Sequence, residues 1–351
     1  MHRVLKKTIQ VGNVLIGGNH PVSIQSMCNT LTQDTEATVQ QIRSLSAAGC
    51  EIIRVAVPDS EAAQAISTIK KQINIPLIAD IHFDYRLAIA SILAGVDALR
   101  LNPGNIGSEN NVKAVIDYAR ERRIPIRIGV NSGSLQKDKL EKYGVSAQAI
   151  VESALEHVAI LEKLNYDEIK ISVKASSVPL TIESYRLLSS KCPYPLHLGV
   201  TESGTEFTGT IKSSIGIGTL LAEGIGDTIR VSLTDDPVKE VLVAKQILKS
   251  LGLREGLEII SCPTCGRTLI DLINLAKQTE IALKPYENKN ITVAVMGCVV
   301  NGPGEAREAD FGIAGGKGEG LIFQKGKIIK KTNEKDLLKE LMALIEQNIN
   351  Q

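Results

Sequence analysis

Short apolar runs rich in β-branched residues alternate with amphipathic stretches between about residues 20 and 250. Each run ends in polar or glycine residues, and a helical pattern follows it. Such runs are typical of buried strands, and the stretches between them are typical of helices that cover a sheet. The runs predict strands at 22–26, 51–55, 76–80, 98–102, 125–130, 168–173, 195–200 and 227–232.

The stretches between the strands carry helix signals. Asp34 is expected to cap a helix whose apolar face holds Ile42 and Leu45, and similar patterns cover 113–122 and 147–164. Strands that alternate with helices predict βαβ units and a parallel sheet. About eight such repeats favour an α/β fold of the (β/α)8 barrel type. An open doubly wound sheet is the alternative, but the GxGxxG turn typical of it is absent after the first strand.

Polar side chains gather at the predicted carboxyl ends of these strands, which meet at one mouth of a barrel. Burying so many cations without partners would cost several kcal/mol each, so we interpret the set as a polyanion site. Arginine offers paired donors to phosphate oxygens, which suggests a phosphorylated or diphosphorylated substrate. The strand-end residues are Gln25, Ser26, Arg54, Asp80, His82, Arg100, Asn102, Arg127, Asn131, Lys170, Ser172, Lys174, His197, Thr201, Glu202, Arg230 and Ser232. Any one of them alone could form an ordinary salt bridge at the rim.

The βα rhythm stops at SLGLREGL (250–257), and a smaller α/β unit follows. We therefore predict two domains, 1–250 and 251–351. In the second, the pattern predicts strands at 257–261, 291–296, 311–314, 321–324 and 327–329, and helices at 268–278 and 335–347. The segment GIAGGKGEG (312–320) lacks the GK[ST] ending of a phosphate loop, so we interpret it as a hairpin.

Cysteines in the second unit have the spacing of a metal site. Cys262 and Cys265 form a C-x-x-C pair, and Cys298 follows 33 residues later. Both segments leave predicted strands and enter Gly/Pro turns, whose N–H groups can donate to cluster sulfides. All five histidines lie upstream, so the closed ligand set of a structural zinc site is missing, and a zinc knuckle is the weaker alternative. Three thiolates fit a 4Fe–4S cluster with one iron left for another ligand, and Glu305 is the local candidate, although it could also be an ordinary first-turn helix glutamate.

Composition narrows the function classes. Forty basic and 39 acidic residues give a net charge of +1, and aromatic residues make up 3% without any tryptophan, so neither nucleic acid nor a membrane surface is an expected partner. No run is apolar enough for a signal peptide or a membrane span. Cys28, Cys50 and Cys192 have no ligand spacing and are expected to be small buried hydrophobic residues. This cysteine usage indicates a cytoplasmic protein.

Long segments resemble one enzyme family. CPTCGRT, MGCVVNGPGEAREADFGIAGG, PLIADIHFDYRLA, LRLNPGNIG, IRIGVNSGSL and IRVSLTDDP are similar to the 4-hydroxy-3-methylbut-2-enyl diphosphate synthases. The resemblance covers essentially the whole chain and matches the bacterial two-domain form. A small departure is Cys28, where a small polar residue is expected.

The resemblance implies a function and a set of site residues. The activity would be the two-electron reductive ring opening and dehydration of 2-C-methyl-D-erythritol 2,4-cyclodiphosphate, in the methylerythritol phosphate route of isoprenoid biosynthesis. Cys262, Cys265, Cys298 and Glu305 would hold a 4Fe–4S cluster, with Glu305 and Glu202 as catalytic carboxylates. Arg54, Arg100, Arg127 and Lys170 would bind the diphosphate, with His82, Asn102, Asn131 and Arg230 beside them. The implied partners are a flavodoxin or ferredoxin and a second copy of the chain, whose cluster domain would complete the site.

Two other classes of protein share part of this pattern. A radical S-adenosylmethionine enzyme would carry its three cysteines in one short run near the N-terminus, and none is present. A non-catalytic metal-binding module fused to a phosphate-binding barrel remains the alternative, and iron content with visible absorbance would separate it from an iron–sulfur enzyme.

Overall fold

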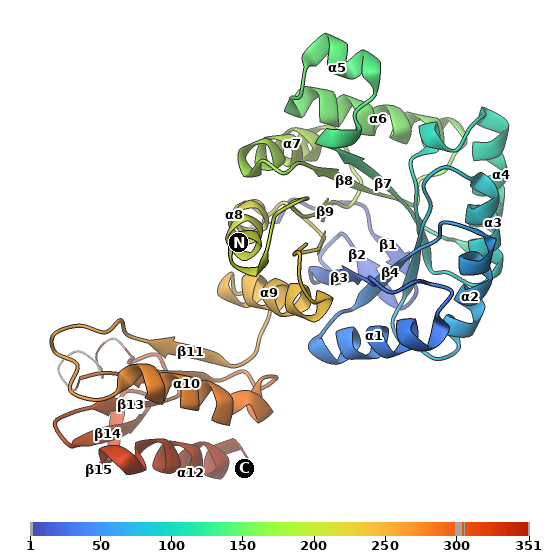
Figure 1. Ribbon diagram of the computed structural model, residues 1–351. Coiled ribbons are helices and arrows are strands. Elements are labelled where there is room, and N and C mark those ends of the chain that lie inside the picture. Colours follow the sequence, from blue (N-terminus) through green and yellow to red (C-terminus); the bar gives the residue numbers. More distant parts are fainter. Residues whose placement is uncertain (1–2, 299–303, 305, 350–351) are drawn as a thin grey trace. The chain divides into compact units, whose positions relative to one another are not determined.

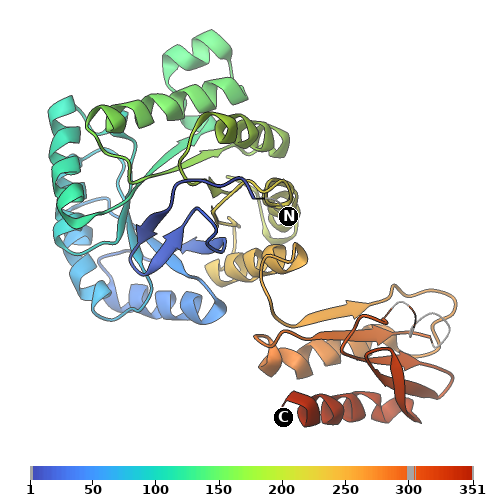
Figure 2. The same ribbon diagram turned by 180° about the vertical axis from the view of Figure 1, so that it is seen from behind.

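The computed structural model describes residues 3–298, 304 and 306–349. The chain forms two compact units, Met1–Leu253 and Arg254–Gln351, and each is described by itself. Figure 1 shows helices arranged around the strands of the first unit, and Figure 2 shows the same unit from behind.

The first unit is a barrel of parallel strands. The hydrogen-bonded order is β8-β7-β6-β5-β4-β3-β10-β9, and a bridge between Ile171 and Leu196 joins β8 to β9 and closes the ring. The predicted (β/α)8 barrel, followed by a smaller α/β unit, is thereby confirmed. The strands are β3 (Ser23–Met27), β4 (Ile52–Ala56), β5 (Leu77–Asp80), β6 (Ala98–Arg100), β7 (Ile126–Asn131), β8 (Ile169–Lys174), β9 (His197–Leu198) and β10 (Thr228–Ile229).

Helices follow the strands as the apolar spacing predicts. Asp34 accepts a hydrogen bond of 3.0 Å from the Ala37 N–H and caps the first helix. The helices are α1 (Thr35–Ala48), α2 (Ser60–Lys70), α3 (Tyr85–Leu93), α4 (Glu109–Arg122), α6 (Ala147–Lys163), α7 (Val178–Lys191), α8 (Glu206–Ala222) and α9 (Pro237–Ser250). A short additional helix, α5 (Lys137–Tyr143), lies between β7 and α6 and was not predicted.

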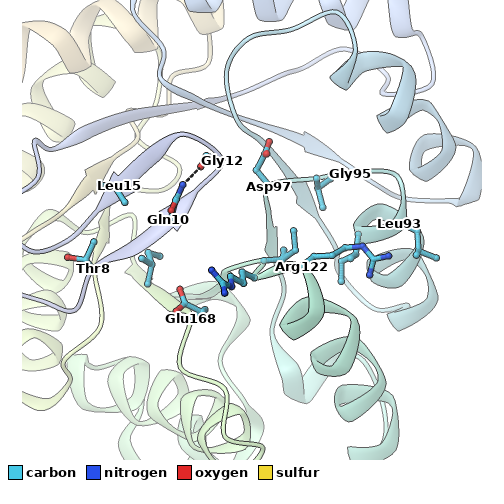
Figure 3. A pocket seen from close by; sticks show the side chains of 14 residues that line it. Thr8, Gln10, Gly12, Leu15, Leu93, Gly95, Asp97, Arg122 and Glu168 are labelled. Atoms are coloured by element: carbon cyan, nitrogen blue, oxygen red, sulfur yellow. Dashed lines mark hydrogen bonds between the residues drawn. The ribbon is translucent and has the colours of Figure 1, made fainter.

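A hairpin that sequence analysis missed covers the amino-terminal end of the barrel. Its strands, β1 (Ile9–Val11) and β2 (Val14–Ile16), pair antiparallel. Their apolar side chains pack on Ile52, Ile78 and Ala98, which lie at or near the starts of β4, β5 and β6. Figures 2 and 3 show the hairpin at this end. The hairpin thus covers the amino-terminal end of the barrel and leaves the carboxyl ends of the strands uncovered.

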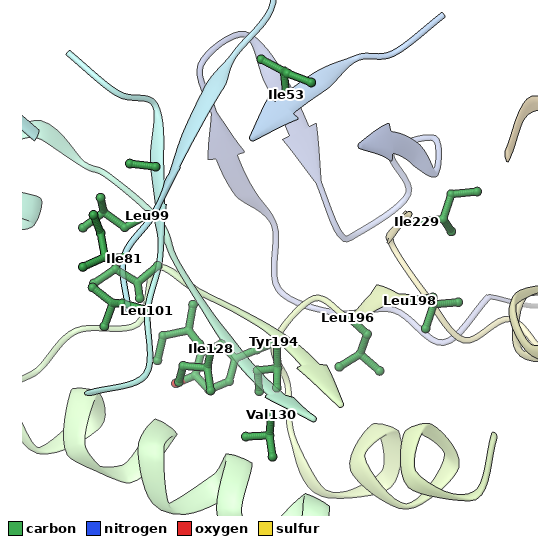
Figure 4. Packing of buried hydrophobic residues seen from close by; sticks show 14 of the residues in the cluster. Ile53, Ile81, Leu99, Leu101, Ile128, Val130, Tyr194, Leu196, Leu198 and Ile229 are labelled. Atoms are coloured by element: carbon green, nitrogen blue, oxygen red, sulfur yellow. The ribbon is translucent and has the colours of Figure 1, made fainter. Parts of the chain in front are cut away.

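Strand residues that face outward form the main core with the helices. Leu99 of β6, Ile128 of β7 and Leu198 of β9 are among the buried residues of this core, and Figure 4 labels all three. Alternate positions on the same strands point into the barrel, because successive side chains of a strand face opposite sides. Cys28, Cys50 and Cys192 are buried as expected.

The second unit is a mixed sheet with helices. The strand order is β11-β12-β13-β14-β15, with the first three parallel and the others antiparallel. The elements are β11 (Glu258–Ser261), α10 (Leu272–Leu283), β12 (Thr292–Met296), β13 (Phe311–Gly315), β14 (Glu319–Gln324), β15 (Lys327–Asn333) and α12 (Leu337–Ile349). GIAGGKGEG spans the β13–β14 hairpin, as predicted. Helix α10 begins later than predicted because Asp271 caps it, accepting from the Asn274 N–H at 3.3 Å.

No helix among the described residues has both the length and the apolar character needed to cross a membrane.

Candidate functional site

The inward-facing positions of the barrel strands carry most of the predicted site residues. Strand pairing places Asp80 beside Arg100, Arg100 beside Arg127, and Arg127 beside Lys170. These positions share one face of a parallel sheet, so their side chains meet inside the barrel. The structure therefore brings the predicted cations together from strands far apart in sequence.

Asp80 is the acidic centre of one side of this cluster. Its carboxylate lies 3.5 Å from Arg54, 3.2 Å from Arg100 and 3.8 Å from the ring of His82. Burial alone would raise the pKa of Asp80, but Arg54, Arg100 and Arg127 outweigh burial and hold the pKa below its usual range. Asp80 is therefore ionised and orients two guanidinium groups.

Glu240, on helix α9, is the acidic residue on the other side of the cation cluster. Its carboxylate lies 3.6 Å from Arg230 and accepts hydrogen bonds from the Leu233 N–H at 2.9 Å and the Ser26 hydroxyl at 3.3 Å. Burial raises the pKa of Glu240 and outweighs the attraction of Arg230. Met27 lies between the two sides, with its sulfur 2.9 Å from Arg54 and 3.7 Å from Arg230.

Cations outnumber carboxylates in this cluster, and several are left without an acidic partner. Arg127 donates to the Ser172 hydroxyl at 2.6 Å, and Lys174 has no ion pair among the described residues. Burial, reinforced by repulsion from neighbouring arginines, lowers the pKa of Arg54 to about 10 and the pKa values of Arg127 and Lys174 well below their usual ranges. The Nε atoms of Arg54, Arg100, Arg127 and Arg230 are buried without a partner in the described part of the chain. Such a cluster has unused hydrogen-bond donors for an anion.

Lys170 and Lys174 both face inward from β8, but they differ in depth. Lys174 ends the strand and feels Arg127, Arg230, Arg54 and Glu240. Lys170 lies four residues earlier, only 1% exposed, and its nearest charges include Asp227, which precedes β10 and is paired with Arg3. Burial and Arg127 lower the pKa of Lys170 to about 7. Lys174 thus lies nearer the mouth than Lys170.

Two asparagines at the mouth have different freedom. The Asn102 amide donates to the Gly129 carbonyl at 3.0 Å and accepts from the Gly129 N–H at 2.9 Å, so both of its ends are engaged. Asn131 ends β7 and is half-buried, and no hydrogen bond joins its amide to another described residue. Asn131 can turn toward a ligand, whereas Asn102 joins two strands.

Glu202 follows β9 with an unusual backbone. Its φ angle is +51°, in the left-handed region that side chains other than glycine rarely adopt. The Ser203 hydroxyl donates to the Ser232 carbonyl, and the Thr234 N–H donates to the Gly204 carbonyl at 2.9 Å. These two bonds tie the loop after β9 to the segment after β10. The exposed Glu202 carboxylate makes no ion pair or hydrogen bond within the residues that the structure describes.

The cysteines of the second unit follow the carboxyl ends of two neighbouring strands of its sheet. Cys262 follows β11, and Gly297 and Cys298 follow β12, which pairs with β11 in parallel. The Gly297 N–H donates to the Cys262 sulfur at 3.2 Å, which places Cys262 beside the chain segment that bears Cys298. The Cys265 N–H donates to the Thr268 hydroxyl at 3.2 Å, and hydrogen bonding from the Arg267 N–H lowers the pKa of the exposed Cys265 thiol.

The described residues do not assemble the full predicted ligand set. Glu305, the predicted fourth ligand, lies outside the described residues. Among the residues that are described, no three His, Cys, Asp or Glu side chains are arranged closely enough to hold a metal ion together. The three thiols are nevertheless free, and those of Cys262 and Cys265 lie next to hydrogen-bond donors, which suits the ligands of an iron–sulfur cluster.

Sequence reasoning left several of these features out. Lys174 was named only as one strand-end residue, and the acidic partner Glu240 and the close approach at Gly129 were not found. A signal for Lys174 existed, because Lys170, Ser172 and Lys174 alternate on one face of β8. No signal existed for Glu240, which comes from a helix packed against the barrel.

A separate cavity of about 770 Å³ lies at the amino-terminal end of the barrel. Figure 3 shows Gln10 and Gly12 of the hairpin on one side, and Asp97 and Arg122 on the other. Catalytic residues of (β/α)8 barrels come from the opposite end. The cavity is therefore not the candidate active site.

Family models match both units. The model described as GcpE TIM-barrel domain matches residues 6–245, and the model described as GcpE protein C-terminal domain matches residues 258–347. A protein of Clostridium perfringens named 4-hydroxy-3-methylbut-2-en-1-yl diphosphate synthase (flavodoxin) is 64% identical over 99% of both chains. A protein of the same name from Caldanaerobacter subterraneus is 62% identical, also over 99% of both chains.

Solved structures agree on the fold of the first unit alone. The structure of dihydropteroate synthase from Yersinia pestis is 13% identical, with a TM-score of 0.51, and the match covers 70% of this chain and 97% of that one. At this level of identity the likeness indicates a shared barrel and nothing about activity.

Proposed function

This chain belongs to the GcpE family of 4-hydroxy-3-methylbut-2-en-1-yl diphosphate synthases, and from that premise we propose that it catalyses the same reaction. The substrate is 2-C-methyl-D-erythritol 2,4-cyclodiphosphate. It takes up two electrons and two protons, the carbon–oxygen bond to the ring phosphate breaks, and a hydroxyl group leaves as water. The product is 4-hydroxy-3-methylbut-2-enyl diphosphate. The observation that carries this proposal is the 64% identity over nearly the whole of both chains.

In this proposal the barrel, residues 1–250, binds the diphosphate. The cations at the barrel mouth outnumber their acidic partners, so a dianionic ring relieves the repulsion among them. These cations are Arg54, Arg100, Arg127, Arg230 and Lys174. The buried Nε atoms of the four arginines support this role, because phosphate oxygens would supply the acceptors they lack in the described structure. His82 and Asn131 contact the substrate from the rim, and Asn102 acts by fixing β6 to β7.

Lys170 is a poorer diphosphate ligand than Lys174 in this arrangement. Burial lowers the pKa of both lysines, so their charge does not distinguish them. Their position does, because Lys170 lies four residues before Lys174 on β8, deeper in the barrel. Lys170 therefore contributes by filling the deeper layer of the barrel, and Lys174 takes the contact that sequence analysis gave to Lys170.

The second unit, residues 251–351, holds the redox group. Cys262, Cys265 and Cys298 would bind a 4Fe–4S cluster, and Glu305 would be the ligand of its fourth iron. The donor set fits such a cluster, because the three thiols are free and the Gly297 N–H already donates to the Cys262 sulfur. When bound, the cluster supplies electrons one at a time and a Lewis-acidic iron.

Glu202 is the proton donor in this proposal. Its carboxylate is exposed and unengaged in the described structure, and its left-handed backbone is held by the neighbouring Ser203 and Thr234 bonds. Backbone strain of this kind gathers at functional sites, where surrounding bonds stabilise it. Glu202 Oε would hold the proton that passes to the substrate, while the arginines hold the diphosphate still.

The partners follow from the same proposal. A flavodoxin, which the names of the relatives mention, or a ferredoxin delivers the electrons. A second copy of the chain completes the site, and an apolar face on α8 supports dimerisation. Phe207, Ile211 and Ile215 recur at helical spacing there, and Phe207 is 78% exposed. The thiolate ligands need a reducing compartment, which favours the cytoplasm.

The test is turnover by the full chain purified without oxygen. With reduced flavodoxin and the cyclodiphosphate, the protein should form the allylic diphosphate, and the substrate should disappear at the same rate. Iron and sulfide are measured on the same sample. A sample with about four iron and four sulfide per chain that leaves the substrate unchanged would refute the proposed reaction. A colourless protein that binds zinc would favour the non-catalytic module.

A further inference from the structure

A buried histidine on α6 holds the turn that follows β6. The Gly104 N–H donates to His157 Nδ1 at 3.2 Å, across 53 residues of sequence. Gly104 lies in a single 3₁₀ turn, Pro103–Asn105, which begins directly after Asn102. Within this turn the Asn105 N–H donates to the Asn102 carbonyl, but the Gly104 N–H has no partner in the turn itself. The imidazole supplies that acceptor.

The histidine also packs tightly against the turn. A Cβ placed on Gly104 would lie 2.6 Å from His157 Cε1 and 3.1 Å from Nδ1, closer than side chains allow. His157 itself is only 3% exposed. Burial lowers the pKa of His157 more than the neighbouring Glu156 raises it, so the ring is neutral with its proton on Nε2 and a lone pair on Nδ1. The close packing of His157 and the hydrogen bond from Gly104 together hold the turn in place.

The turn is continuous with the substrate site. Asn102 immediately precedes it and pairs with Gly129 through both ends of its amide. Arg100, two residues earlier, donates to the same Gly129 carbonyl at 3.2 Å and to Asp80 at 3.2 Å. A shift of the turn would move Asn102, and with it the Gly129 carbonyl on which Arg100 rests.

We propose that His157 is a positioning residue of the substrate site: it anchors Gly104 and thereby sets Asn102 and Arg100 at the barrel mouth. This inference rests on the proposed role of the mouth in binding the diphosphate. It assigns a function to a residue on the outer helix layer that touches no substrate.

Three substitutions separate the acceptor from the bulk of the side chain. Asparagine carries Oδ1 on Cγ, where histidine carries Nδ1, so H157N keeps an acceptor in nearly the same place. H157Q moves the acceptor one bond further out, and H157L fills the space without an acceptor. S153A, at another buried position of α6, is the control for a general disturbance of the helix.

The first measurement is hydrogen exchange of the peptide covering 102–107 in the full-length protein. H157L and H157Q should exchange faster there, while H157N and S153A should match wild type. The second is steady-state kinetics with the cyclodiphosphate. H157L should raise KM by about two- to ten-fold, the range for one lost neutral hydrogen bond, with kcat within about two-fold of wild type. H157N should restore KM.

Several results would overturn the inference. Wild-type exchange at 102–107 in H157L would mean that His157 does not anchor the turn. Faster exchange with an unchanged KM would mean that the anchor does not reach the substrate site. A KM as high in H157N as in H157L would mean that the acceptor is irrelevant. R100A is measured in parallel: an unchanged KM there would show that the proposed substrate site is wrong, and the inference would fall with it.

Discussion

Asn102 and Gly129 form a closed pair across β6 and β7, with the amide donating to the Gly129 carbonyl at 3.0 Å and accepting from its N–H at 2.9 Å. Gly129 has no side chain, and two guanidinium groups lie beside the space that a Cβ would fill. A Cβ there would lie 3.1 Å from Ser172 Oγ and 3.2 Å from both Arg100 Nε and an Arg127 terminal nitrogen. The site therefore depends on a residue that offers only its backbone.

Replacing Gly129 tests this close approach. In G129A the added methyl group should push one guanidinium away, and KM for the cyclodiphosphate should rise about ten-fold, since a lost charge-assisted hydrogen bond costs about 1.5–3 kcal/mol. Iron content should stay at the wild-type value. G218A is the matched control, because a Cβ on Gly218 of α8 meets nothing within 4 Å. Equal KM values in the two variants would contradict the proposed arrangement of Arg100 and Arg127.

The barrel could be predicted because its strands and helices have different periods. The inward-facing arginines could be placed at the barrel mouth because the end of each strand is visible in the sequence as a change from apolar to polar residues. The hairpin of β1 and β2 escaped because its strands, Ile9–Val11 and Val14–Ile16, are too short to show a period. Strands β9 and β10 were predicted too long, because the extended chain there pairs over His197–Leu198 and Thr228–Ile229 alone.

The finer parts of the site depend on neighbours that no local pattern reveals. Lys170 and Lys174 look equivalent in the sequence, both facing inward from β8. Only the barrel shows that Lys170 lies near Asp227 and Lys174 near Arg230. The pairing of Asn102 with Gly129 likewise joins residues 27 apart in the chain. Such contacts are set by strand register, which the sequence of a single strand does not contain.

The two lysines give a second prediction. K174M should raise KM for the cyclodiphosphate about ten-fold or more, whereas K170M should change KM less than three-fold, because a charged contact to phosphate is worth about 1.5–3 kcal/mol. Steady-state kinetics of K174M and K170M shows which lysine contacts the substrate, and the iron content of each variant shows that it is intact. A larger loss in K170M would restore the role that sequence analysis gave to Lys170.

The buried Lys170 also predicts a pH dependence of stability. Its pKa falls from 10.5 to about 7 in the folded protein, so between these values the unfolded chain binds more protons, and stability rises with pH. The penalty is complete below about pH 7 and absent above the unfolded pKa. K170M should therefore raise the melting temperature more at pH 7 than at pH 10. An equal shift at both pH values would mean that Lys170 is not the titrating group.

The cysteines give a third prediction. Cys262→Ser, Cys265→Ser and Cys298→Ser should each remove most of the iron, because thiolates hold the cluster. Cys192→Ala is the control, since Cys192 is buried in the barrel and burial raises the pKa of its thiol. Iron and sulfide analysis after anaerobic purification gives the result. Glu305→Ala should retain more iron than the serine variants and lose most activity, and near wild-type turnover there would remove Glu305 from the ligand set.

Glu202 gives a fourth prediction, in which chemistry and binding separate. Glu202→Gln keeps the size of the side chain but cannot exchange a proton, so kcat should fall about 100-fold or more, in the range that general acid–base catalysis contributes. The dissociation constant of the cyclodiphosphate, measured by calorimetry, should change little. Glu206→Gln, at the first residue of α8, is the control for a nearby carboxylate. A fall in affinity without a fall in kcat would make Glu202 a binding residue.

The last prediction is that activity requires two chains. The barrel cations and Glu202 all precede residue 253, while the cluster cysteines follow residue 254. Only residues 251–257 separate α9 from β11. A linker this short restricts how far the second unit can travel over its own barrel. A two-fold dimer removes the restriction, because each chain can lend its second unit to the other and both sites form at once.

Complementation between two inactive variants tests the shared site. Cys298→Ser has an intact barrel, and the double variant Arg100→Ala, Arg127→Ala has an intact cluster unit, so a mixed dimer contains one complete composite site. With free exchange half of the dimers are mixed, and activity should recover to about a quarter of wild type. Differently tagged chains establish that exchange has occurred. Phe207→Glu in both variants should abolish the recovery by charging the apolar face of α8. If mixed dimers form and stay inactive, each cluster unit serves its own barrel, and the shared site is wrong.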